Sequence, residues 1–415
     1  MKQAKALIPI LFILLLITTI IGLVWGSYRF AKYEVRGSDF SIQWIAIHSL
    51  VTAGESPFSE RTNTLIQNSV HGQTGFTLGV TPKYTSPLYS GILLLPFALI
   101  WNKTLTYALW LTLQFIALFG VILLSMRLTG WQPAWFIFLP FSIFTIFSYH
   151  ILIPWLDGGL PIWSVLFLVS ALLALSQNRN ELAGIFLALS AIQPLMIILP
   201  LIFILLWAAI QKRKLLILWF FITILFISIV GIFLVPDWVI QYLRLLFNFQ
   251  QNFPPGSPGY LFKLTWPGLG KQLGWLLSAA LLFVLLAEWW LALKREFRWF
   301  VWTVCLTLVI SQWIGIPTIP AYFVELILPM ILISAMLAEH WKRAGNWTAV
   351  VFSMLVFVWE WVLFYRDITS RQSNLLLNLL IPLPLILFIG LYWVRWWAIK
   401  PRRLLVEEIK LSESY

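Results

Sequence analysis

The sequence predicts an all-α membrane protein that crosses the bilayer many times. Of its 415 residues, 60% are hydrophobic and only 11% are charged, a composition too apolar for a chain that folds in water. Apolar stretches such as 7–24 and 215–235 are much longer than the roughly ten residues that one strand of a membrane β-barrel needs. Helices are therefore the expected spanning elements.

Uninterrupted apolar segments predict about twelve membrane spans. The first, 6–27, follows Lys2 and Lys5 without a convincing cleavage site after it, so we expect a retained signal anchor. The further expected spans are 104–126, 132–151, 160–177, 181–193, 195–210, 214–235, 272–293, 297–316, 320–340, 346–364 and 374–398. The apolar segment 86–100 is short for a hydrocarbon core of roughly 30 Å, and we expect it to lie at the membrane surface.

The basic residues predict the orientation of the chain. The formal net charge of +12 does not indicate a nucleic-acid partner, because the basic residues separate apolar segments instead of forming a stripe. If 86–100 does not cross, clusters such as 212–214 and 400–403 share the cytoplasmic side with the N-terminus. Both termini are then cytoplasmic, and the long loops 27–103 and 236–271 lie outside the cytoplasmic membrane.

The loop 27–103 contains most of the residues that could carry chemistry. Apolar side chains recur at helical spacing near its start, at Phe40, Trp44, Ile47 and Val51. This pattern predicts an amphipathic helix with Asp39 at its beginning. Asp39 could be a reactive carboxylate, or it could cap the helix together with Ser38, which is a common role for both residue types.

Three short motifs follow one another in the first half of the chain. They are Ser38-Asp39-Phe40, then Tyr84-Thr85-Ser86-Pro87 with Leu95-Pro96 after it, then Gln193-Pro194 ahead of Leu199-Pro200-Leu201. In this order they resemble the GT-C superfamily of membrane glycosyltransferases, and most of all glycosyltransferase family 87, which includes mannosyltransferases. The likeness covers mainly residues 1–235. Two departures are Gln193, where a Lys is usual, and Asp157-Gly158-Gly159, which replaces a Gly-Gln step.

The resemblance implies a catalytic module at 1–235 that includes the loop 27–103. The second outer loop, 236–271, the C-terminal membrane helices at 272–400 and a cytoplasmic tail at 401–415 follow it. The implied reaction transfers a sugar, with inversion, from a polyprenyl-phosphate-linked donor to a lipid or glycan acceptor at the extracytoplasmic face. Inversion needs one carboxylate to accept the acceptor's proton, and Asp39 is the candidate base.

Several other residues are candidates for the site. Glu34, Glu55 and Asp157 are the alternative acids, and Asp157 is the best second site residue. The candidate substrate-binding residues are Lys83, Tyr84, Arg36, Asp157, Gln193, Tyr322 and Glu325. Lys83 and Arg36 would supply cations for a phosphate group.

Two further acids lie inside or beside expected spans. Glu325 is an intramembrane carboxylate one turn after Tyr322, and either substrate positioning or a hydrogen bond to a neighbouring helix could retain it there. Glu360 is expected at the membrane interface. No His or Asp cluster has metal-ligand spacing, so we expect no metal and no cofactor besides the donor substrate.

Two other classes of function are open from the residues alone. A transporter or flippase of lipid-linked sugars would need polar residues at the bilayer midplane on several helices. A non-catalytic envelope-assembly protein would tolerate the loss of the Asp39 carboxylate. All three readings share membrane lipids as partners and exclude nucleic acid.

Overall fold

The computed structural model describes residues 2–33, 38–70, 82–252, 262, 266, 268–314, 320–370 and 382–399, and every regular element in these residues is helical. The N-terminal half contains α1 (Lys2–Tyr33), α2 (Ser38–Ala53), α3 (Glu60–Val70), the 3₁₀ helix η1 (Leu88–Leu93), α4 (Leu95–Ala98), α5 (Lys103–Thr129), α6 (Trp135–Ile146), α7 (Tyr149–Asp157), α8 (Pro161–Ser176), α9 (Asn180–Ser190) and α10 (Pro194–Ile210). The C-terminal half contains α11 (Lys214–Leu234), α12 (Trp238–Asn252), α14 (Gly270–Ala292), α15 (Phe297–Ser311), the 3₁₀ helix η2 (Pro320–Leu326), α16 (Ile327–Trp341), α17 (Arg343–Ser370) and α19 (Pro382–Ile399).

The all-helical fold is confirmed, but the expected number of spans is not. Among the described residues, 5 helices are long and apolar enough to cross a membrane, or 6 if α6 and α7 form one bent span. The five are 103–129, 214–234, 272–292, 321–341 and 343–366. Five other expected spans, 160–177, 181–193, 195–210, 297–316 and 374–398, correspond to apolar helices of 10–17 residues, which fall short of the roughly 20 residues that a straight crossing requires. The expected anchor 6–27 lies in α1, a helix of 32 residues.

The expected span 132–151 is interrupted, because the chain bends by 63° between α6 and α7. Two neighbouring residues of α17 bind the two helix ends at this bend. Trp361 donates its indole N–H to the Phe147 carbonyl at the end of α6, at 2.9 Å. Glu360 accepts the backbone N–H of His150 in the first turn of α7, at 3.4 Å. Backbone groups exposed by the break are thus satisfied by a third helix.

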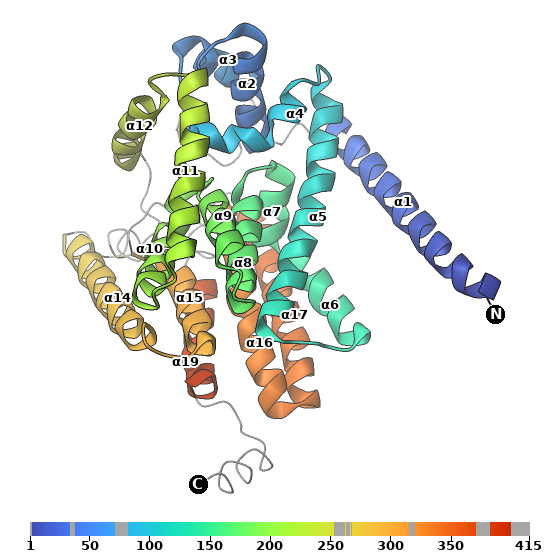
Figure 1. Cartoon of the computed structure of the whole chain (residues 1–415), viewed down its shortest axis with the longest axis vertical. Coiled ribbons are helices and arrows are strands. Elements are labelled where there is room, and N and C mark those ends of the chain that lie inside the picture. The colour runs from blue at the N-terminus through green and yellow to red at the C-terminus, as the bar shows by residue number, and fades with distance from the viewer. Residues whose placement is uncertain are drawn as a thin grey trace, which may run out of the picture.

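The polar loop regions gather at one end of the helical bundle (Figure 1), where α2, α3, α4 and α12 lie close to the ends of α5 and α11. The segment 86–100, expected at the membrane surface, forms only the short helices η1 and α4. The predicted amphipathic pattern of α2 is confirmed at three of its four positions. Phe40, Trp44 and Ile47 are buried, whereas Val51 is 39% exposed.

Close helix contacts hold the short helix α9 in the interior. A Cβ atom on Gly184 would overlap the Leu216 carbonyl of α11, so only glycine permits this approach. Ser190, the last residue of α9, accepts the Ser164 hydroxyl of α8 through its carbonyl. The structure therefore confirms a short helix close to the expected 181–193, although it ends three residues earlier, at Ser190.

Candidate active site

The candidate base, Asp39, lies in the first turn of α2 against the turn that joins α7 and α8. This turn, Asp157-Gly158-Gly159, is called the 157–159 turn below. A Cβ atom built on Gly159 would stand 3.0 Å from Oδ2 of Asp39. A Cβ atom built on Gly158 would stand 2.7 Å from Cβ of Phe40. The absence of side chains at both glycines lets the start of α2 approach the turn.

One face of α5 fixes the backbone of this region. The Tyr107 hydroxyl donates to the Leu156 carbonyl, and the Gln114 amide donates to the Gly159 carbonyl. Between them, the Trp110 indole N–H donates to the Gly158 carbonyl at 2.7 Å. Positions 107, 110 and 114 share one helix face. A membrane helix therefore supplies three donors to a turn that would otherwise leave buried carbonyls unpaired.

Replacing Gly158 by Ala is expected to destabilise the protein more than the same change at Gly130. Both glycines have a left-handed backbone, with φ of 72° and 71°, where an Ala side chain costs about 1–2 kcal/mol. Gly130 has no neighbouring atom within 4 Å of a built Cβ, whereas at Gly158 the new methyl group would also push Phe40 away. Thermal unfolding of both variants in detergent measures the difference, and equal losses would contradict the close packing.

Burial raises the pKa of Asp39. The residue is half-buried, and the surrounding protein atoms remove water from its carboxylate. This loss of solvation raises its pKa from the ordinary 3.8 to about 6. A carboxylate with this pKa is still mostly ionised at neutral pH. It is also a stronger proton acceptor than a fully solvated one, because basicity rises with pKa.

Tyr322 and Glu325 of η2 lie next to this region. Tyr322 is buried and lies within electrostatic reach of Asp39, Tyr242 and Glu325. Glu325 is completely buried and accepts the Ser311 hydroxyl at 3.1 Å and the Gln312 amide. Of the two roles open for Glu325, the structure shows the hydrogen bond to a neighbouring helix, while its Oε2 has no partner among the described residues.

The other predicted substrate-binding residues differ in how far they are buried. Lys83 is exposed, and Tyr84 is fully buried with its hydroxyl bonded to the Pro87 carbonyl at 3.1 Å. Gln193 is half-buried and follows Ile192, which packs in the same cluster as Phe40. Arg36 lies outside the described residues, so its predicted role stays a prediction.

Of the alternative acids, only Asp157 is placed near Asp39 among the described residues. Asp157 ends α7 and belongs to the turn that contacts Asp39, so the structure brings these two acids to one region. Glu55 forms a surface ion pair with Arg61 at 2.8 Å. Glu34 lies outside the described residues.

Two tyrosines that the sequence did not single out also lie at this end of the bundle. Tyr89 donates its hydroxyl to the Ala191 carbonyl at 2.8 Å, and burial raises its pKa. Tyr242 of α12 lies within electrostatic reach of Tyr84, Tyr89 and Tyr322, and burial raises its pKa as well. Both phenols are neutral hydrogen-bond donors at physiological pH. Neither tyrosine lies in a recognisable motif, so only the fold indicates that they lie near the site.

The described residues include no group of three His, Cys, Asp or Glu side chains suited to a metal ion. The expected independence of a metal stays a prediction. Asp39 and Asp157 are the acids that could approach a cation here.

The chain matches one known family over more than half of its length. Residues 84–317 match the profile described as Glycosyltransferase family 87. The match includes the 157–159 turn and Gln193, whereas Asp39, Tyr322 and Glu325 lie outside it. No curated protein and no solved structure matches the chain. The match extends further toward the C-terminus than residue 235, the limit of the likeness that the motifs indicated. The chain therefore belongs to glycosyltransferase family 87 and is a membrane glycosyltransferase.

Proposed function

We propose that this protein transfers a sugar from a polyprenyl-phosphate-linked donor to a hydroxyl group of a lipid or glycan acceptor. The transfer proceeds with inversion at the extracytoplasmic face of the cytoplasmic membrane, with Asp39 as the general base. Family membership favours this reaction over the transporter and the envelope-assembly protein. The observation that carries the proposal is the contact between Asp39 and the 157–159 turn, at the end of the bundle where the polar segments gather.

The chemistry needs one proton acceptor. As the acceptor hydroxyl attacks the anomeric carbon, Asp39 takes its proton, and the bond between that carbon and the donor phosphate oxygen breaks. Polyprenyl phosphate leaves with the bonding electrons as a stable anion, so no general acid is required. The raised pKa of Asp39, about 6, strengthens it as a base while leaving most molecules ionised at neutral pH.

Other residues of this end would bind the substrates. Lys83 is exposed and could approach the donor phosphate, and Arg36 is a second cation close to Asp39 in the sequence. Asp157 could accept hydrogen bonds from sugar or acceptor hydroxyls. Tyr322, on η2, lies within electrostatic reach of Asp39 and could donate to the same substrates. Gln193, near the end of α9, would contact a sugar by neutral hydrogen bonds.

The transfer rate is expected to fall with acidification, with a midpoint near pH 6. Below that pH Asp39 becomes protonated and cannot accept a proton, and above it the rate reaches a plateau. The measurement is kcat/KM between pH 4.5 and pH 8 in a buffer of constant ionic strength. A midpoint near 4, as for a solvated Asp, would mean that Asp39 is not the titrating base.

The donor class is tested with purified protein in nanodiscs. Labelled sugar on polyprenyl phosphate is compared with the same sugar on a nucleoside diphosphate, and the anomeric configuration of the product is determined by NMR. The proposal expects transfer only from the polyprenyl phosphate, and an inverted anomer. Transfer from the nucleotide alone would refute the donor class, and a retained anomer would refute the single-base mechanism.

A further inference from the structure

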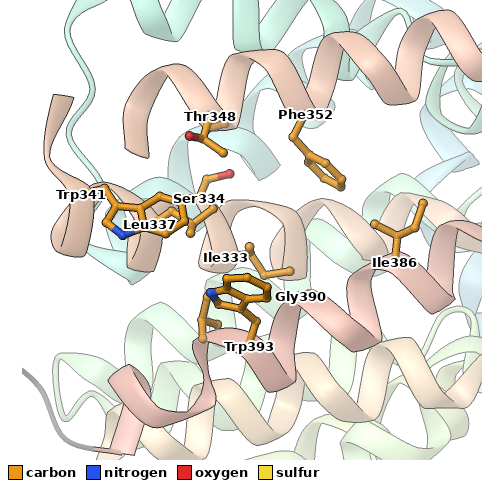
Figure 2. Close-up of a pocket in the computed structure, with 11 residues that line it drawn as sticks. Ile333, Ser334, Leu337, Trp341, Thr348, Phe352, Ile386, Gly390 and Trp393 are labelled. Carbon is orange, nitrogen blue, oxygen red and sulfur yellow. The ribbon is translucent and has the colours of Figure 1, made fainter. Parts of the chain in front are cut away.

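An apolar groove lies between α16, α17 and α19, with a volume of about 220 Å³. Figure 2 shows Thr348 and Phe352 of α17 on one side and Ile386 and Trp393 of α19 on the other, with Ser334 of α16 between Thr348 and Trp393 and Trp341 at one end. Gly390 belongs to the lining as well, and a Cβ there would stand 3.0 Å from Cδ1 of Ile333.

The side chains that line the groove are mostly apolar. Its two hydroxyl groups are bonded within their own helices, Ser334 to the Met330 carbonyl at 2.8 Å and Thr348 to the Ala344 carbonyl at 2.9 Å. Neither hydroxyl is therefore free to donate a hydrogen bond to a ligand. The volume is below the roughly 300–1,000 Å³ of pockets that enclose a whole small molecule. It suits a single hydrocarbon chain.

The end of the groove at Trp341 carries positive charge. Lys342 and Arg343 follow directly, and both are exposed, without a charged partner among the described residues. Two other basic residues in this part of the bundle are already paired, because Arg298 of α15 binds Glu339 at 2.5 Å and Arg395 of α19 binds Glu288 at 3.0 Å. Lys342 and Arg343 are thus available to an anion outside the protein. Trp341 and Trp393 are exposed beside them, as is typical of side chains at the level of lipid head groups.

This groove is distant from the candidate active site. α16 begins directly after η2, which carries Tyr322 and Glu325, and reaches Trp341 after 15 residues. At 1.5 Å per residue the helix is about 20 Å long, which is most of a hydrocarbon core of roughly 30 Å. The charged end of the groove therefore belongs to the membrane leaflet opposite the site.

We propose that the groove binds one anionic glycerophospholipid from that leaflet. One acyl chain lies between α16, α17 and α19, and the phosphate group lies against Lys342 and Arg343. The two cations select an anionic head group, because each contributes attraction for negative lipids at the membrane surface. This site is separate from the donor and acceptor sites and does not depend on the proposed reaction.

The test is native mass spectrometry of the full-length protein, delipidated and then supplied with an equimolar mixture of phosphatidylglycerol and phosphatidylcholine. One retained phosphatidylglycerol per chain is expected. Thr348→Phe, which fills the groove, is expected to lower its retention by about tenfold or more. The matched control is Val351→Phe on the exposed face of α17, which is expected to leave retention unchanged.

A second pair of variants tests the head group. Lys342→Asn/Arg343→Gln is expected to abolish the preference for phosphatidylglycerol. Lys212→Asn/Lys214→Gln removes two exposed cations from another helix junction and is expected to have no effect. Lys212 and Lys342 both have a positive φ, of 57° and 51°, which Asn adopts more often than most other residues. Equal retention of both lipids by the unmodified protein, or equal losses in variants and controls, would overturn the proposal. Dimers without bound lipid would indicate a second copy of the chain instead.

Discussion

Asp39→Asn is expected to reduce sugar transfer by about 10²–10⁴-fold, the usual contribution of a positioned general base. Asn has nearly the same size as Asp, so it fits against Gly159 as the carboxylate does. The helix start loses only the attraction between the carboxylate and its dipole, about 0.3–1 kcal/mol, so α2 should still form. The amide nitrogen and oxygen cannot accept the acceptor's proton at neutral pH. The variant thus removes the base and preserves the geometry.

The matched control is Asp237→Asn. Asp237 precedes α12, whose Trp238 packs against Tyr89 of η1, so it lies at the same end of the bundle. Its side chain is exposed and accepts the Gln241 amide. Transfer by this variant is expected within about twofold of the unmodified enzyme, because exposed acid-to-amide changes have small effects. Retention of more than a tenth of the activity by Asp39→Asn, with an unchanged melting temperature, would remove Asp39 from the mechanism.

The sequence could predict the local structure around Asp39 because helical periodicity is a local signal. The spacing of Phe40, Trp44 and Ile47 correctly indicated a helix with Asp39 in its first turn. The contact with Gly159 could not be predicted in this way, since it joins residues far apart in the chain. The α5 stripe of Tyr107, Trp110 and Gln114 likewise looks like part of an ordinary membrane helix until the 157–159 turn is placed beside it.

The number of spans shows a second limit of sequence reasoning. Hydropathy identifies apolar segments, but it does not show where a helix breaks inside one, as at Phe147 and Ser148. The break is stabilised by Glu360 and Trp361 of α17, more than 200 residues away in the sequence. Glu360 was expected at the membrane interface, and its level in the bilayer stays a prediction. Its carboxylate is fully buried because it binds the start of α7.

Glu360→Ala is expected to lower the free energy of unfolding by several kcal/mol, since each buried donor left without an acceptor costs about 1–3 kcal/mol. The Glu360 carboxylate binds Nδ1 of His150 at 2.5 Å and the backbone N–H of the same residue at 3.4 Å. Both groups are buried, so Ala would leave two donors in an apolar environment without an acceptor. The change also removes a negative charge from the N-terminus of α7, where it is favourable.

Thermal and denaturant unfolding in detergent measure the loss, and Glu339→Ala is the control. Glu339 pairs with Arg298, but its side chain is 44% exposed, and such surface pairs contribute only about 0–1 kcal/mol. The double variant His150→Phe/Glu360→Leu replaces the buried pair by apolar residues of similar volume and is expected to be more stable than Glu360→Ala. If the two single variants lost equal stability, the pair would not hold α7 in place. Because α7 ends in the 157–159 turn, transfer activity is expected to fall with stability in Glu360→Ala and to recover in part in the double variant.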